Sequence, residues 1–323
     1  MGKAKRGLMV RQRIAITFDV DMVDYMGHHS NVDELEESFP AIQRILLDFP
    51  QVRTNWFIRI DSQISSIYGR PDFVLRRHAN ILDWLRIHGH QVGWHHHAYR
   101  FYGGSWSQET RVEIATREIR RFGEIANRHG MSASRMGWGW HTNESIQVLD
   151  EIGFVVDSSC IPRPCYPWEA NVRDWSRAPS CPYRPSRIDY QTPGEPSLQL
   201  LQIPMSTTHI PAPGDSEEVR RYINLAYRPE VFARALSNLE KRELVVTITH
   251  PYELLQNSHK HSLIAFDMEV LRNNLTQLAS IDAEFVTMED EAQRYFLGAG
   301  HQEKGRTVDV GIKAAPGSDC GVV

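Results

Sequence analysis

The chain has 323 residues, of which 41% are hydrophobic and 24% are charged. That composition supports a large apolar core and excludes an intrinsically disordered chain. The 36 basic and 40 acidic residues give a net charge of −4, which lacks the electrostatic signature of a nucleic-acid-binding protein. The length fits a single (β/α) barrel of roughly 250 residues with additions.

The N-terminal sequence predicts neither a leader nor a membrane-spanning segment. Residues 1–10 are basic but lack an apolar stretch of signal-peptide length. No later segment reaches the ~18 apolar residues of a spanning helix. We therefore expect a cytoplasmic protein. The cysteines show no CxxC spacing, which predicts reduced thiols at Cys160, Cys165, Cys181 and Cys320.

The predicted elements alternate between strand and helix. In chain order they are strand 13–19, helix 32–48, strand 53–60, helix 72–88, strand 91–95, helix 108–129, strand 134–138, helix 143–152 and strand 154–158. Runs of β-branched and aromatic residues mark the strands, whereas apolar residues at intervals of three and four mark the helices. This alternation predicts a parallel sheet flanked by helices.

A Pro-rich segment over 160–214 interrupts the pattern, with eleven prolines among 55 residues. We expect an irregular insertion that contains one strand over 198–206 and lies over the barrel mouth. The later elements are helices 217–226 and 229–241, strand 244–249, helix 266–280 and strand 284–287. About seven strand–helix units predict an incomplete (β/α) barrel over 13–297, with an N-terminal extension over 1–12 and a flexible tail over 298–323.

Polar residues stand where the predicted strands end, and in a parallel barrel those ends form the face that holds the active site. Strand 13–19 ends at Asp19-Val20-Asp21, where carboxylates two residues apart on extended chain project to the same side. Strand 244–249 is followed by His250, whose pKa near neutrality suits acid–base chemistry. Together, such carboxylates and imidazoles indicate a hydrolytic metal site.

Three consecutive histidines, His95, His96 and His97, lie at the end of strand 91–95. Imidazole suits Zn²⁺ and similar ions. If the strand continues, His95 and His97 share a face and can bind one ion; if a helix begins at once, His95 pairs with Tyr99 instead. His96 faces elsewhere in either case.

In this order, the segments resemble the motifs of the polysaccharide deacetylase superfamily, carbohydrate esterase family four, over roughly residues 14–290. The first motif is similar to the Asp-x-Asp form of peptidoglycan-deacetylase-like members. The five matching runs are Ile16-Thr17-Phe18-Asp19-Val20-Asp21, His90-Gln91-Val92-Gly93-Trp94-His95, Arg135-Met136-Gly137-Trp138-Gly139, Gly153-Phe154-Val155-Val156-Asp157-Ser158-Ser159 and Thr249-His250-Pro251.

The resemblance implies a role for each matching residue. Asp19 is the expected catalytic base, Arg135 tethers it, and His250 is the expected general acid. Asp21 and His95 are expected ligands of a divalent metal ion, with Zn²⁺ the expected ion. We expect Asp157 to keep His250 protonated.

Two departures from the family pattern affect the site. The second metal histidine of the family stands four residues after the first, where this chain has Tyr99. We therefore expect His97 to supply the third ligand, with His141 or an incomplete site as the alternatives. Gly137 and Trp138 replace the Pro and Tyr that the family favours in its third motif, which leaves the acyl group open.

The predicted activity is metal-dependent removal of an N-acyl group, expected to be N-acetyl, from a carbohydrate such as a surface-glycan precursor. The alternatives are hydrolysis of another small amide or formamide, and a catalytically degenerate sugar-binding protein. The sequence makes no prediction of oligomeric state. The expected substrate-binding residues are Trp94, Trp138, Trp140, His141, Tyr99 and Tyr252.

Overall fold

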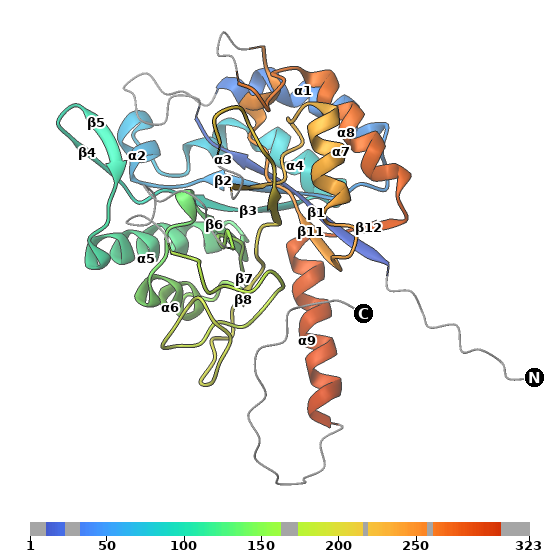
Figure 1. Cartoon of the computed structure of the whole chain (residues 1–323). Helices are drawn as coiled ribbons and strands as arrows, with labels where there is room; N and C mark the ends of the chain where they lie inside the picture. The colour runs from blue at the N-terminus through green and yellow to red at the C-terminus, as the bar shows by residue number, and fades with distance from the viewer. Residues whose placement is uncertain (1–10, 23–32, 163–173, 216–218, 257–260, 305–323) are drawn as a thin grey trace, which may run out of the picture.

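A sheet of parallel strands forms the centre of the computed structural model, which describes residues 11–22, 33–162, 174–215, 219–256 and 261–304. The strands follow the spatial order β11-β1-β2-β3-β6-β7-β8, and β12 also pairs with β1 (Figure 1). Their bounds are β1 (Gln12–Val20), β2 (Thr54–Arg59), β3 (Gln91–His96), β6 (Ala133–Met136), β7 (Val156–Asp157), β8 (Leu201–Gln202), β11 (Leu244–Val246) and β12 (Ala283–Phe285).

Helices follow most strands and cover the sheet (Figure 1). They are α1 (Asp33–Leu47), α2 (Ser62–Tyr68), α3 (Phe73–Arg77), α4 (Ala79–Ile87), α5 (Val112–Arg128), α6 (Asn143–Glu151), α7 (Pro229–Ser237), α8 (Met268–Ser280) and α9 (Met288–Lys304), with short 3₁₀ turns η1 (Gly137–Gly139) and η3 (Pro251–Leu254). The curled, open sheet confirms the predicted incomplete (β/α) barrel.

Residues alternate between two faces of the sheet, as the period of two in a strand requires. Ile14, Ile16 and Phe18 of β1 belong to the large core cluster that includes the helices. Ala15 belongs to a second cluster, made of strand residues from the opposite face and the start of α9, including Ala292. The odd-numbered positions of β1 therefore face away from the covering helices, which directs Asp19 toward the concave side.

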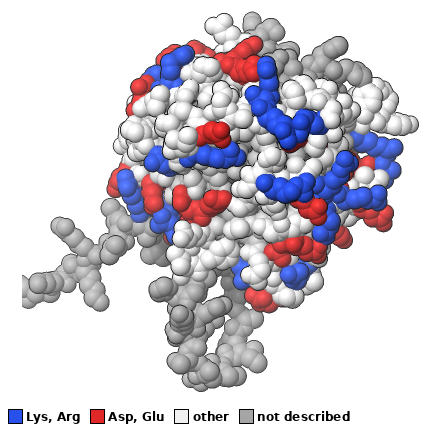
Figure 2. Space-filling view, turned by 180° about the vertical axis from the view of Figure 1, so that it is seen from behind, with Lys and Arg blue, Asp and Glu red and all other residues white. Residues whose placement is uncertain are grey.

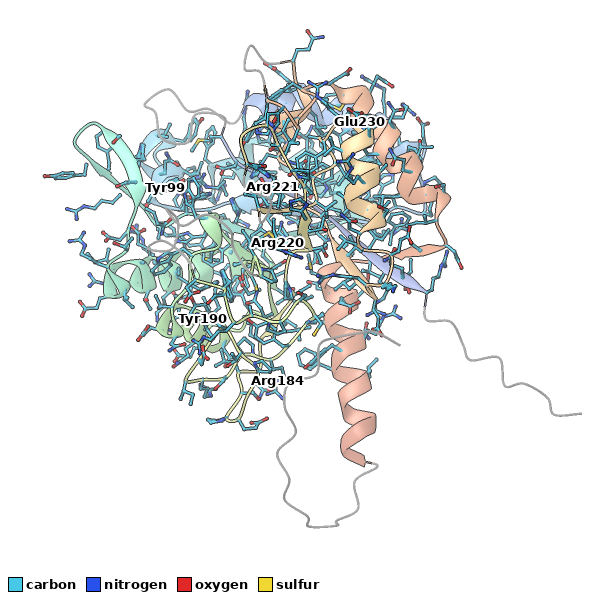
Figure 3. All side chains as sticks on the ribbon, in the orientation of Figure 1. Tyr99, Arg184, Tyr190, Arg220, Arg221 and Glu230 are labelled. Atoms are coloured by element: carbon cyan, nitrogen blue, oxygen red, sulfur yellow. The ribbon has the colours of Figure 1, made fainter. Side chains whose placement is uncertain are left out.

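The insertion supplies part of the sheet itself. Its strand was predicted over 198–206, and the structure has β8 there, paired in parallel with β7 at the sheet edge. Residues 217–226 were predicted to be helical, which is wrong for the described part: β10 (Arg220–Tyr222; Arg220 is labelled in Figure 3) pairs antiparallel with β9 (Thr207–His209). The hydrogen bonds between these two strands pair backbone N–H and C=O groups that a helix would pair within itself.

Two further elements differ from the sequence pattern. The predicted helix 72–88 is divided into α3 and α4 at His78, whose backbone leaves the helical region (φ −113°, ψ 28°) and whose side chain is buried. A hairpin of β4 (Tyr99–Tyr102) and β5 (Ser105–Gln108) precedes α5, where a helix was expected from residue 108. The hairpin projects from the body of the molecule (Figure 1).

The C-terminal segment and one cysteine also differ from what the sequence predicts. α9 continues to Lys304, so the tail predicted from residue 298 is helical in its first part; residues 1–10 and 305–323 lie outside the described residues. Cys160 is free and buried as expected, but Cys181, expected to be a reduced thiol, is disulfide-bonded.

The surface and the helices give two further observations. Basic and acidic side chains are interspersed on the face seen in Figure 2. Within the described residues, we find no helix with the length and apolar character needed to cross a membrane.

Candidate active site

A pocket of about 330 Å³ lies at the carboxyl ends of the central strands. This is the face on which parallel barrels place their active sites, and the volume is at the small end of the range for small-molecule pockets. Its lining residues are Asp19, Asp21, His95, His97, Arg135, Met136, Gly137, Trp138, Gly139, Ile161, Met205, Tyr222, Ile248, His250 and Tyr252.

Asp19 is held at the end of β1 by a buried guanidinium. Arg135 Nη1 donates to Asp19 Oδ1 over 2.9 Å and to Thr17 Oγ1 over 2.6 Å. The other Arg135 nitrogens donate to the backbone oxygen and the hydroxyl of Ser158, both over 2.9 Å. Arg135 therefore fixes the orientation of the Asp19 carboxylate, which is only 2% exposed, as a tether should.

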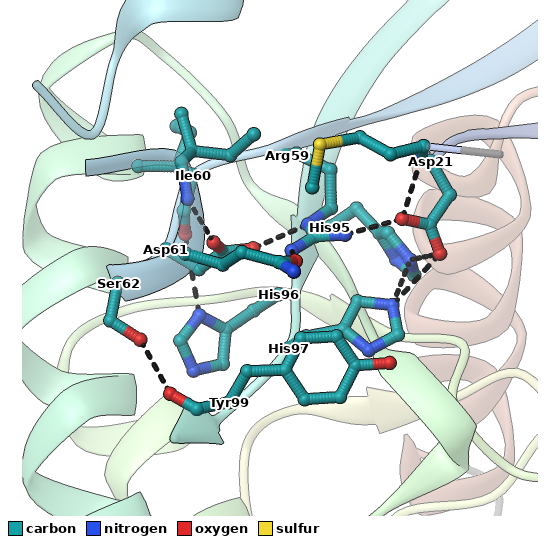
Figure 4. A network of polar contacts seen from close by, with 12 residues as sticks. Asp21, Arg59, Ile60, Asp61, Ser62, His95, His96, His97 and Tyr99 are labelled. Atoms are coloured by element: carbon teal, nitrogen blue, oxygen red, sulfur yellow. Dashed lines mark hydrogen bonds and ion pairs between the residues drawn. The ribbon is translucent and has the colours of Figure 1, made fainter. Parts of the chain in front are cut away.

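Asp21, His95 and His97 converge on one point of the pocket wall (Figure 4). Asp21 Oδ2 lies 3.1 Å from His97 Nε2 and 3.9 Å from His95 Nε2, and the two imidazole nitrogens are 3.1 Å apart. β3 continues through His96, so the strand geometry expected for a shared face is the one observed. His96 lies on the other face, 5.8 Å from the ring of Phe122.

The donor set of this cluster fits a divalent metal ion. His95 Nδ1 lies 2.9 Å from the backbone oxygen of Arg135 and donates its proton there, which leaves a lone pair on Nε2. A backbone carbonyl that fixes the histidine tautomer is the usual partner of a metal-bound imidazole. The ligand atoms of the three residues all lie within 4.8 Å of one another, as Zn²⁺ ligands must.

The charge states of these residues also suit a cation. Burial alone would raise the pKa of Asp21, but the charges of Arg59 and His97 and the bonds to both histidines hold it well below its usual value. Burial lowers the pKa of His97 to about 4, although Asp21 opposes this shift. At neutral pH the cluster therefore presents a carboxylate and a neutral His97 imidazole, the states in which these groups bind metals.

Gly137 provides the space that His97 occupies. A Cβ atom at position 137 would lie only 2.1 Å from Cε1 and 2.2 Å from Nδ1 of the His97 ring. Such contacts are far inside van der Waals distance, so a larger residue at 137 would displace the imidazole. Glycine at position 137 therefore leaves the space that allows His97, two residues after His95, to join the cluster.

His250 is paired with Glu253, and not with Asp157 as the sequence suggested. Glu253 Oε2 lies 3.3 Å from His250 Nδ1 and also accepts from the His250 backbone N–H over 2.8 Å. Burial alone would lower the pKa of His250, but the Glu253 carboxylate outweighs it and raises the pKa to about 9. His250 is therefore protonated at neutral pH, as a general acid must be.

Asp157 lies behind the pocket, where it pairs with His141. The distance from Asp157 Oδ2 to His141 Nε2 is 3.4 Å, and His141 Nδ1 contacts Ser145 Oγ at 2.9 Å. Asp157 also accepts from the backbone N–H and the hydroxyl of Ser159, over 3.0 and 2.7 Å. Neither residue lines the pocket, so neither a ligand role for His141 nor a partner role for Asp157 toward His250 is compatible with this geometry.

Two of the six expected substrate-binding residues, Trp138 and Tyr252, line the pocket. Trp138 adopts a left-handed backbone conformation (φ 58°) that is uncommon for a bulky residue. Its indole N–H donates to Tyr99 Oη over 2.8 Å. Tyr99, labelled in Figure 3, is itself only 2% exposed, so it supports Trp138 from behind instead of touching a substrate.

Trp94, Trp140 and His141 were expected to contact substrate, and this was wrong. Trp94 is completely buried and donates to the backbone oxygen of Ile60 over 2.9 Å; as an even-numbered residue of β3, it faces the helices. Trp140, 4% exposed, belongs to the same helix-facing core. Adjacency in sequence suggested that all three lie near the site, whereas strand alternation directs Trp94 away from it.

Sequence reasoning missed several residues of the site. Glu253 could have been found from its position three residues after His250, because residues at that spacing meet in a helical turn. Arg59, which contacts Asp21, had the weaker signal of a charge inside an apolar strand. Nothing local in the sequence placed Ile161, Met205 and Tyr222 on the pocket wall.

Among known proteins, a solved structure shares the fold of this chain. No protein-family model and no curated protein matches the sequence. A solved structure from Mycobacterium smegmatis, described as a "putative polysaccharide deacetylase", aligns over 96% of this chain and 97% of its own, with a TM-score of 0.51 and 14% identity. The chain has the fold of this deacetylase.

Two other solved structures align with lower scores. Peptidoglycan deacetylase PdaC from Bacillus subtilis, in a mutant form, aligns over 92% of this chain and 98% of its own, with a TM-score of 0.41 and 10% identity. A family 4 carbohydrate esterase from Streptomyces lividans, in complex with acetate, aligns over 87% and 94%, with a TM-score of 0.40 and 9% identity.

Proposed function

We propose that this protein is a metal-dependent hydrolase that removes an N-acyl group, most simply N-acetyl, from a carbohydrate. The observation that carries the proposal is the convergence of three groups on one pocket: the tethered carboxylate of Asp19, the Asp21–His95–His97 cluster and the cationic His250. The fold shared with a deacetylase from Mycobacterium smegmatis supports the same reaction class.

The cluster of Asp21, His95 and His97 would hold the metal ion, because its donor atoms and its proton states fit Zn²⁺ or a similar ion. When bound, such an ion acts as a Lewis acid that polarises an acyl carbonyl and eases the deprotonation of water. The residues of the chain supply the remaining chemistry.

In the proposed reaction Asp19 accepts a proton from the attacking water, whose oxygen forms a bond to the acyl carbon. Arg135 keeps the Asp19 carboxylate oriented for that transfer. Cleavage of the C–N bond then needs a proton on the amine nitrogen, because an amine leaves poorly as an anion. His250, kept cationic by Glu253, is the donor. The half-buried ring of Trp138 and that of Tyr252 offer flat faces for a sugar.

The test is the Asp19→Asn variant, assayed for acetate release and for bound zinc. We expect the variant to lose activity by at least about a hundredfold, the usual contribution of a positioned base, while it retains stoichiometric zinc. Full activity in Asp19→Asn would exclude Asp19 as the base. Wild-type protein that binds no divalent ion would instead favour a non-catalytic sugar-binding protein.

A panel of candidate substrates tests which class of compound the protein hydrolyses. N-acetylated nucleotide sugars represent surface-glycan precursors, N-acetylated oligosaccharides represent finished polymers, and a simple formamide represents the competing amide hydrolases. We propose a surface-glycan precursor as the substrate, with the pocket of about 330 Å³ taking the sugar ring that carries the acyl group. Turnover of the formamide alone would exclude a carbohydrate substrate.

A further inference from the structure

A buried arginine, Arg59 at the end of β2, contacts the candidate metal cluster from outside the pocket lining. Its side chain is completely buried, and each side of its guanidinium has a polar partner. Nη1 donates to Asp21 Oδ1, Nε donates to Asp61 Oδ2, and Nη2 donates to Gln63 Oε1 over 2.8 Å (Figure 4). Two carboxylates thus neutralise a cation that would otherwise be costly to bury.

The guanidinium is fixed from the opposite side by the start of α2. Asp61 caps this helix, because its Oδ1 accepts the backbone N–H of Ile64 over 2.9 Å. Gln63 lies in the first turn of the same helix and is fully buried. Burial alone would lower the pKa of Arg59, but the charges of Asp61 and Asp21 raise it above its usual value. Arg59 is therefore a permanent, immobilised cation.

The contact with Arg59 makes the two oxygens of Asp21 different. Oδ1 accepts from Arg59 Nη1 and from the backbone N–H of Met22 over 2.8 Å. Oδ2 lies 3.1 Å from His97 Nε2 and 3.9 Å from His95 Nε2. With Oδ1 committed to two donors, only Oδ2 faces the imidazoles.

We propose that Arg59 is a positioning residue that restricts Asp21 to binding the metal ion through a single oxygen. This inference rests on the proposed function, in which Asp21, His95 and His97 hold the ion. The fork of arginine is required, because separate nitrogens of one guanidinium donate to Asp21 and to Asp61, whereas a lysine ammonium is a point charge that cannot form the same set of bonds.

The experiment compares wild-type protein with Arg59→Lys, which retains the positive charge but loses the fork. Zn²⁺ affinity is measured by calorimetry on chelator-treated protein, and the visible absorption spectrum is recorded with Co²⁺, whose absorption weakens as its ligands increase in number. We expect Zn²⁺ binding to weaken about 10–100-fold, the usual effect of losing a group that orients a metal ligand. We also expect weaker Co²⁺ absorption, because Asp21 can then turn its second oxygen toward the ion.

Two further variants make the result interpretable. Arg70→Lys is the matched control: Arg70 also donates to a carboxylate, Asp72 Oδ1, over 2.6 Å, but its side chain is 44% exposed and lies outside the pocket lining. We expect it to match wild type. Gln63→Leu removes one of the bonds that hold the guanidinium, and severalfold weaker Zn²⁺ binding is expected, so the inference remains testable even if Arg59→Lys fails to fold.

The outcomes separate this inference from the function on which it rests. Wild-type Zn²⁺ affinity and an unchanged Co²⁺ spectrum in a folded Arg59→Lys variant would overturn the positioning role and leave the proposed function intact. Unchanged Zn²⁺ binding in Gln63→Leu would overturn it equally if Arg59→Lys does not fold. A wild-type protein that binds neither ion would overturn the proposed function first.

Discussion

At the scale of single residues, the site depends on contacts that tolerate little change. Gly137 is the clearest case, because a methyl group there would lie 2.1 Å from the His97 ring. His97 is enclosed on its other side by Tyr99, whose ring centroid lies 4.4 Å from that of the imidazole. The histidine thus has no space into which it could retreat without leaving the cluster.

We therefore expect Gly137→Ala to lose metal binding while the protein stays folded. Displacement of His97 removes one of three candidate ligands, and we expect Zn²⁺ affinity to fall at least about a hundredfold, at the upper end of what lost ligand orientation costs. Calorimetry and thermal unfolding measure the two effects. Gly298→Ala in α9 is the control, since a Cβ there meets no atom within 4 Å. Equal zinc affinity in Gly137→Ala would remove His97 from the ligand set.

The second residue-scale prediction concerns the pH dependence of activity. His250 has a pKa of about 9 because of Glu253, so activity that needs protonated His250 is present at neutral pH and is lost as the pH rises through about 9. Glu253→Gln removes the charge that opposes the effect of burial on the pKa of His250. The alkaline limb of the plot of kcat against pH should therefore move to lower pH by at least about one unit. An unshifted limb in this variant would assign the alkaline limb to another group.

The same shift has a consequence for stability. Because folding raises the pKa of His250, this residue stabilises the folded state. Its contribution to the free energy of unfolding is fully present below pH 6.5, the ordinary pKa of histidine, and is lost as the pH rises through about 9. Glu230→Gln changes an exposed carboxylate on α7. It is the control both for the pH profile of kcat and for the free energy of unfolding measured as a function of pH.

At the scale of elements, one edge of β1 is shared by two strands. β12 pairs with Gln12 to Ile14, and β2 pairs from Ile16 onward. Asn55 of β2 fills the junction: its Nδ2 donates to the backbone oxygens of Ile16 over 3.0 Å and Val286 over 3.4 Å, and its Oδ1 accepts the N–H of Met288 over 2.8 Å. This one side chain thus connects β1, the end of β12 and the start of α9.

Asn55→Ala should therefore destabilise the fold strongly. The substitution removes three buried hydrogen bonds to backbone groups, and at ~1 kcal/mol for each we expect a loss of about 3 kcal/mol in the free energy of unfolding. Chemical denaturation measures this value. Asn273→Ala, at an exposed position of α8, is the matched control. A loss below about 1 kcal/mol would mean that water satisfies the junction.

At the scale of the whole molecule, the candidate metal cluster connects strands that are distant in sequence. Asp21 follows β1, His95 lies in β3 and His97 directly follows it, and β2 lies between β1 and β3 in the sheet. An ion held by all three should stabilise the folded state over the unfolded chain. At a hundredfold excess over Kd the gain is about 2.7 kcal/mol.

Removal of the metal should therefore lower the midpoint of thermal unfolding by about 5 °C for a chain of this size. The measurement compares chelator-treated protein with and without added Zn²⁺ at one protein concentration. Asp21→Asn should abolish the difference, because it removes the carboxylate of the cluster. A zinc-dependent rise that persists in Asp21→Asn would locate the binding elsewhere.

Much of the fold and part of the site could be predicted from the chain alone. The alternation of apolar runs fixed the order of strands and helices, and the period of two along β3 placed His95 and His97 on one face and His96 on the other. Asp19 and Asp21 were found because polar residues end an apolar strand. These features depend on neighbours within a few residues, which the sequence shows directly.

Other features depend on which segments meet in space. Helix geometry was expected over 217–226, but pairing with β9 made part of it a strand. Trp94 was assigned to substrate from its position beside His95, yet the orientation of the sheet turns it into the helix-facing core. Asp157 was assigned to His250, whereas the curl of the sheet brings it to His141.

By itself, the sequence determined the type of barrel, the strand ends that carry the polar residues and the chemical character of those residues. Only the tertiary structure decided the partners: Glu253 for His250, Arg59 for Asp21 and Gly137 for His97. The physical reason is that side-chain alternation is a local property of the backbone, whereas the contact between two charged groups depends on strand register, sheet curvature and helix packing across the whole chain.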